Sequence, residues 1–147
     1  MDRFGPVVLA MTGGGLIAAQ APINARLKLV VGSPLLAAAV SFAVGTLLLA
    51  VAVLLTNAQG GVTALGGGPW WAYLGGLCGA VLVTATLIAA PRLGVTSTFV
   101  AVIVGQVAIA AVIDRFGLFG VAARGLTPTR VVAIILLALS LVLLLRN

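Results

Sequence analysis

Among the uncharged polar side chains that stand inside or beside the long apolar stretches of this 147-residue chain, four are candidates for a binding role. They are Gln20, Asn24, Ser41 and Gln106. Amide and hydroxyl groups in such surroundings either join helices to one another or bind a polar ligand, because an unpaired polar group is costly there. We predict that these four side chains line a ligand-binding site.

Asp114 and Arg26 are the charged candidates for a coupling or gating role. Asp114 is the only acidic residue that touches an apolar stretch, so it alone could carry a proton there. Arg115 follows it at the predicted end of a helix, which favours an ion pair between the two at the membrane surface. Arg26 could attract an anion toward Asn24 or hold a lipid headgroup.

Several classes of chemistry lack the residues they need. The chain has no histidine, one cysteine (Cys78) and two acidic residues, so we expect no metal site, no cofactor and no catalytic triad. The formal net charge of +6 is spread over separate loops without a basic run, which argues against nucleic acid as a partner. We therefore predict that the protein is not an enzyme.

Long apolar stretches must position the candidate residues. The composition is 63% hydrophobic and 7% charged, which leaves too little polar surface for a soluble domain of this size. Five of the six prolines stand at or just before the start of a stretch, where a missing N–H costs least. We predict an all-α membrane protein, with residues 1–147 forming one domain of five transmembrane helices. The expected helices are about 4–22, 34–56, 69–90, 93–114 and 128–146.

Pro22 is the exception among the prolines, because it lies within the first apolar segment. A proline there is expected to break or kink the helix and to leave carbonyl groups near residue 18 without their usual donors. Gln20 and Asn24 stand one turn apart across this point. Their amides either line a cavity together with the exposed carbonyls or only satisfy the interrupted backbone.

Basic residues are divided equally between the two sides of the predicted membrane domain. One side carries Arg3, Arg115, Arg124 and Arg130, and the other carries Arg26, Lys28, Arg92 and Arg146. The positive-inside rule then gives little preference for either orientation in the membrane. We predict insertion in both orientations and an antiparallel dimer of ten helices, although a difference of one or two charges could still select one orientation.

Several motifs together resemble the YdcZ-like family of short bacterial inner-membrane proteins, which belongs to the drug/metabolite transporter superfamily. They are Gln-Ala-Pro-Ile-Asn-Ala-Arg-Leu at 20–27, Gly-Ser-Pro at 32–34, Pro-Trp-Trp at 69–71, Gly-Gln at 105–106 and Asp-Arg-Phe-Gly-Leu-Phe-Gly at 114–120. The resemblance implies a multi-pass protein of the bacterial inner membrane that exports small molecules, alone or with a paralogous chain. Arg115 departs from the family pattern, in which a histidine is expected after the aspartate.

These observations favour a secondary active transporter that exports a small molecule by alternating access. Its expected partners are the small molecule, membrane lipid, and either an identical chain or a paralogue in the opposite orientation. A small dual-topology channel for ions or solutes would share the size and charge balance of this chain. A non-transporting subunit of a membrane complex is the third possibility.

Overall fold

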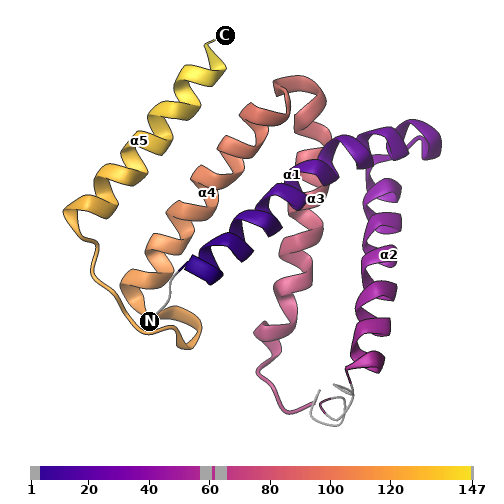
Figure 1. Cartoon of the computed structure of the whole chain (residues 1–147), viewed down its shortest axis with the longest axis horizontal. Coiled ribbons are helices and arrows are strands. Elements are labelled where there is room, and N and C mark those ends of the chain that lie inside the picture. Colours follow the sequence, from indigo (N-terminus) through magenta and orange to yellow (C-terminus); the bar gives the residue numbers. More distant parts are fainter. Residues whose placement is uncertain (1–3, 57–60, 62–65, 147) are drawn as a thin grey trace. The chain divides into compact units, whose positions relative to one another are not determined.

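Helices account for almost all of the regular structure in the computed structural model, which describes residues 4–56, 61 and 66–146. The elements are α1 (Phe4–Val31), α2 (Pro34–Leu55), the short 3-10 helix η2 (Trp70–Leu74), α3 (Gly75–Leu93), α4 (Val95–Phe116), the 3-10 helix η3 (Leu118–Gly120) and α5 (Pro128–Leu145). Within the described residues, five helical segments are long and apolar enough to cross a membrane, with η2 and α3 forming one of them (Figure 1). The predicted all-α fold, with five helical segments long and apolar enough to cross a membrane, is confirmed.

Helices α2 and α5 begin at the predicted residues, and the side chains there explain why. The hydroxyl oxygen of Ser33 accepts a hydrogen bond from the Leu36 N–H at 3.3 Å. The hydroxyl oxygen of Thr127 accepts one from the Arg130 N–H at 3.4 Å. In each case a proline follows the capping residue and occupies the first helical turn, where the N–H that it lacks would have no partner within the helix.

Removal of the Thr127 hydroxyl should therefore destabilise the start of α5. We expect Thr127→Ala to lower the free energy of unfolding by about 1 kcal/mol, the usual contribution of such a cap. Thr127→Ser keeps the hydrogen-bond acceptor and should stay within a few tenths of a kcal/mol of the unmodified protein. Unfolding in mixed micelles, followed by circular dichroism, measures both variants. Equal destabilisation by alanine and serine would contradict the capping role.

Two helix boundaries differ from the prediction because helical backbone continues through a proline. Helix α1 contains Pro22 and ends at Val31, and α3 contains Pro91 and ends at Leu93. A proline removes only its own N–H donor, so the helix can continue when the surrounding residues favour it. The predicted turn at 91–94 is thereby reduced to Gly94, whose φ of +80° suits glycine.

The chain divides into two compact units, Met1–Ile88 and Ala89–Asn147. In the first unit α1 packs against α2, and Gly79 of α3 lies close to the Phe42 ring of α2. In the second unit α4 and α5 lie side by side (Figure 1). The single domain spanning residues 1–147 stays a prediction.

Little of any span is buried inside the chain. At most 11% of the most apolar window of each span is buried, so the outer surfaces are suited to lipid or to another chain. Among the described residues, Ala37 in α2 and Leu87 in α3 are fully buried. Small residues such as Ala37 let helix backbones approach closely where lipid supplies no hydrophobic driving force.

Candidate functional site

Gln20 and Ser41, two of the predicted site residues, are joined directly in the first unit. The Gln20 side-chain amide donates a hydrogen bond from Nε2 to the Ser41 hydroxyl oxygen at 3.2 Å, in partly buried surroundings. Gln20 lies on α1 and Ser41 on α2, so the bond links the two helices. A ligand there can form hydrogen bonds with three further groups: the amide carbonyl of Gln20, its second amide N–H and the hydroxyl hydrogen of Ser41.

A cavity of about 320 Å³ adjoins this pair. Its lining residues come from three helices: Ile17 and Gln20 on α1; Ser41, Phe42, Gly45, Thr46 and Leu49 on α2; Gly79, Leu82 and Val83 on α3. Most of these side chains are apolar, and Gln20, Ser41 and Thr46 are the polar ones. The walls therefore combine an apolar surface with a few neutral hydrogen-bonding groups, which suits binding of a small organic molecule.

Small residues create the space for this cavity. Ser41 and Gly45 stand one turn apart on α2, and Gly79 faces them from α3. A Cβ atom added to Gly79 would come within 3.4 Å of the Phe42 ring, so the glycine permits the close approach of α3 to α2. The cavity thus depends on the absence of side chains as much as on the polar groups beside it.

Asn24, a third predicted site residue, lies one turn beyond Gln20 on α1. Its exposed fraction is only 4%. Asn24 does not line the cavity beside Gln20. The structure therefore places this polar side chain near Gln20 but not in direct contact with the cavity.

Gln106, the fourth predicted residue, lies on α4 in the second unit and is exposed. It makes no hydrogen bond to the residues that the structure describes. The structure thus brings Gln20 and Ser41 together, and Gln106 belongs to the other unit. Their common role in binding a substrate stays a prediction.

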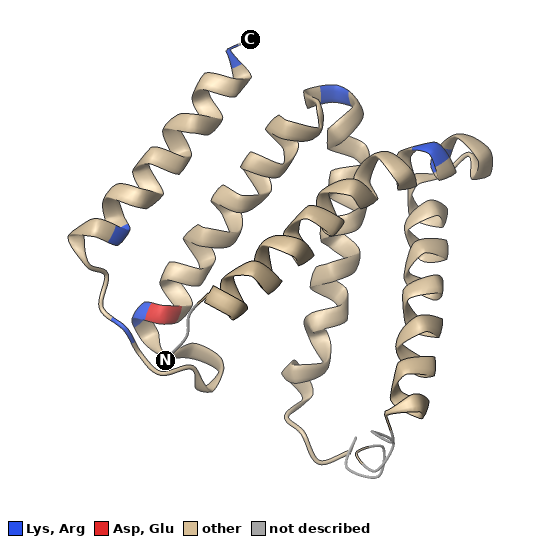
Figure 2. Ribbon diagram, viewed as in Figure 1, with Lys and Arg blue, Asp and Glu red and all other residues tan. Residues whose placement is uncertain are grey.

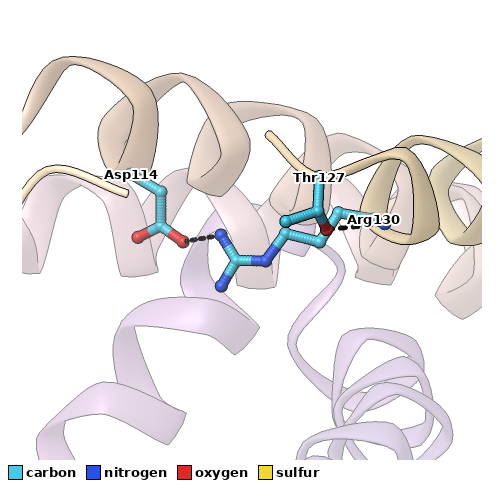
Figure 3. Close-up of polar contacts among 3 residues, drawn as sticks. All are labelled: Asp114, Thr127 and Arg130. Carbon is cyan, nitrogen blue, oxygen red and sulfur yellow. Dashed lines mark hydrogen bonds and ion pairs between the residues drawn. The ribbon is translucent and has the colours of Figure 1, made fainter. Parts of the chain in front are cut away.

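Asp114 pairs with Arg130, which corrects the expected pairing with Arg115. Asp114 Oδ2 and Arg130 Nη1 are 3.1 Å apart, and Figure 3 shows the guanidinium group directed toward the carboxylate. Residues adjacent on a helix point in different directions, whereas the end of α4 and the start of α5 meet at one end of the hairpin. The two side chains are 33% and 41% exposed, so such a pair is worth only about 0–1 kcal/mol.

The connection between α4 and α5 positions this ion pair. Gly117 ends α4 in the left-handed conformation (φ +64°), and its N–H donates to the Ile113 carbonyl. Farther along the loop, the Arg124 N–H donates to the Asp114 carbonyl at 2.6 Å. Thr127 then caps α5, which places Arg130 in the first turn of that helix.

The charged residues of the described segments lie toward helix ends and in the connection between α4 and α5 (Figure 2). Arg26 is exposed near the end of α1, and no ion pair within the described residues includes it. Asp2 and Arg3 lie outside the described residues, as do positions 57–60 and 62–65 of the predicted loop at 57–68. The predicted insertion in both orientations therefore rests on the sequence alone.

Sequence reasoning missed Arg130 as the partner of Asp114, and it missed the large apolar residues of the cavity lining. Arg130 could have been found from the hairpin itself, because the end of one span and the start of the next lie on the same side of a membrane. The small residues Ser41 and Gly45, one turn apart on one helical face, are recognisable in the sequence as a surface for close helix packing. No comparable pattern singles out Phe42 or Leu82, whose role depends on which faces of α2 and α3 meet.

Comparison with protein families gives one match for this chain. The model of the family described as "Putative inner membrane exporter, YdcZ" matches residues 5–143. Neither the curated proteins nor the solved structures gave a match.

Proposed function

Because the chain belongs to the YdcZ family of inner membrane exporters, we propose that it exports a small organic molecule through the cavity beside Gln20 and Ser41. It is a multi-pass protein of the inner membrane, and its family places it among transporters rather than enzymes. The finer proposal is secondary active transport by alternating access, in which the cavity opens to each side of the membrane in turn.

The observation that carries this proposal is the hydrogen-bonded pair of Gln20 and Ser41 at the wall of a cavity formed by three helices. An interhelical hydrogen bond alone would explain the two polar side chains, but it does not require empty space next to them. Transport does require such space, together with groups that replace the hydration of the solute. The cavity supplies both.

Asn24 and Pro22 extend the proposed site along α1. Pro22 has no N–H, so the Ala18 carbonyl lacks the donor that would stand one turn later in an uninterrupted helix. We assign the Asn24 amide and this carbonyl to a hydrogen-bonding surface that a solute reaches when α1 bends at Pro22. This bend is a proposed step of the transport cycle.

Arg26 and Asp114 have proposed gating roles. Asp114 holds α4 to α5 through Arg130, and a contact as weak as this one can break and re-form when helices move. Arg26 follows the proposed bend in α1 by one turn, so a movement there would displace its charge.

Gln106 supports the proposal of a second chain. Its amide is exposed on a transmembrane helix, and an amide inside a bilayer needs a hydrogen-bond partner. In an antiparallel dimer, the other chain supplies a hydrogen-bond partner for this amide, and Gln106 then contributes to substrate binding as predicted. The equal division of basic residues between the two sides is the feature that favours the inverted arrangement.

Comparison of culture media tests export directly. Cells that express the protein should accumulate at least one compound in the medium that cells carrying an empty vector do not. The purified protein should then move that compound in proteoliposomes, at turnover rates below about a thousand per second. Faster, gradient-limited flux would indicate a channel, and flux only with a co-purified partner would indicate a subunit.

A further inference from the structure

The second unit contains a separate cavity of about 360 Å³ between α4 and α5. One stripe of α4 lines it, with the spacing of a single helical face: Val107, Ala110, Ala111 and Asp114. A stripe of α5 with the same spacing faces it: Arg130, Ala133, Ile134 and Leu137. Each stripe carries one charged residue, and both charges stand at the same end of the cavity.

Alanine residues explain why this space exists. Ala110 and Ala111 on α4 and Ala133 on α5 each contribute only a methyl group to the lining, which leaves room beside the larger Val107, Ile134 and Leu137. The interior is therefore apolar, and the Asp114–Arg130 pair forms its polar end. A ligand that fits both parts has an apolar body and one charged end.

The ion pair leaves part of each charged group available. Arg130 contacts Asp114 through Nη1 alone, and within the described residues its Nη2 has no further partner. Both side chains are partly exposed. An incoming anion can therefore approach Arg130 from solvent and replace the Asp114 carboxylate without first uncovering a buried charge.

The charge around the pair favours an anion over a cation. Arg115, Arg124 and Arg130 lie in the segment 114–130, where Asp114 is the only acidic residue, so this segment carries a net charge of +2 (3 − 1). Helix α5 also begins there, and the positive end of its dipole adds to the attraction for negative charge.

We propose that the α4–α5 cavity binds a small amphipathic carboxylate. Its carboxylate pairs with Arg130 in place of Asp114, and its apolar body lies along Ala110, Ala111 and Ala133. This site lies within the second unit, and the proposal does not depend on which compound the protein exports. When no ligand is bound, the Asp114 carboxylate pairs with Arg130 in its place.

Binding of eight-carbon probes tests the proposal. The full-length protein in phosphatidylcholine nanodiscs is titrated with octanoate, octanol and octylammonium by calorimetry, and the signal from empty nanodiscs is subtracted. Octanoate should bind at least about tenfold more tightly than either analogue, because the analogues lack a carboxylate for Arg130. Equal binding of octanol and octanoate would overturn the proposal.

Variants of the ion pair give opposite expected effects. Arg130→Gln should weaken octanoate binding at least about tenfold, whereas Asp114→Asn should tighten it severalfold because the competing carboxylate is gone. Arg146→Gln is the matched control, since this arginine stands at the other end of α5 and does not line the cavity, and it should change binding less than twofold. A gain of affinity cannot come from misfolding, so unchanged or weaker binding by Asp114→Asn contradicts the displacement of Asp114.

Filling the cavity tests where the apolar body lies. Ala133→Leu should weaken octanoate binding, and Ala108→Leu, an equal enlargement at an exposed position of α4 outside the cavity, should not. Nanodiscs that contain phosphatidylglycerol test whether a lipid, and not a free carboxylate, occupies the cavity. If this lipid occupies the site and octanoate cannot displace it, the cavity is a lipid site and the proposal for a free carboxylate fails.

Discussion

Replacing Gln20 by leucine is expected to lower export at least about tenfold, a loss of roughly 1.4 kcal/mol, while the protein stays in the membrane. Leucine is similar in size to glutamine but offers no hydrogen bonds to a solute or to Ser41. An apolar side chain is well tolerated in a membrane span, so the loss of export does not come from failed insertion. The measurement is export of the compounds that accumulate in the medium when the unmodified protein is expressed.

Two further variants decide whether the effect belongs to the cavity. Thr12→Val removes a polar group from an exposed position of the same helix, outside the cavity, and should leave export unchanged. Ser41→Ala should lower export, and its addition to Gln20→Leu should have little further effect because the two residues act as one hydrogen-bonded unit. Normal export by Gln20→Leu at normal protein levels would remove Gln20 from the transport path.

A pair of charge-biased variants is expected to be inactive separately and active together. Arg92→Gln with Ala122→Arg changes the division of basic residues from four against four to five against three. Arg124→Gln with Asn147→Lys changes it to three against five. Each variant should insert in one orientation, because the positive-inside rule then has a clear preference. Neither can form an antiparallel dimer alone, but co-expression supplies both orientations.

Export by the two cell lines and by the co-expressing line measures this effect. Co-expression should restore most of the export that each variant lacks. Two copies of the same biased variant, expressed from two plasmids, are the control for protein amount and should remain inactive. Full activity of either variant by itself would show that one orientation is sufficient, and the antiparallel dimer would be wrong.

The helix starts could be predicted because they depend on local chemistry. Ser33 and Thr127 each precede a proline, and this pair of residues determines the first turn of a helix wherever the rest of the chain lies. The ends of helices were harder to predict. Whether α1 continues through Pro22 depends on whether the helical preference of the following residues outweighs the loss of one backbone hydrogen bond. The sequence does not show which of the two effects is larger.

The candidate site could be predicted only in part. Polar residue type and apolar surroundings identified Gln20 and Ser41, which the hairpin of α1 and α2 then brings within hydrogen-bonding distance. The same criteria selected Gln106, although they contain no information about which face of α4 meets another helix. The partner of Asp114 was not predicted, because adjacency in the sequence favours Arg115, whereas the α4–α5 hairpin brings Arg130 to the carboxylate.

The orientation of the chain in the membrane tests the central claim, an exporter built from two inverted copies, without knowledge of the exported compound. Single cysteines at Gly61→Cys and Asn147→Cys, in a Cys78→Ala background, are labelled in intact cells with a membrane-impermeant maleimide. Because the basic residues are equally divided, about half of each cysteine should react, and all of it after permeabilisation. Complete labelling at one position with none at the other would contradict the inverted homodimer.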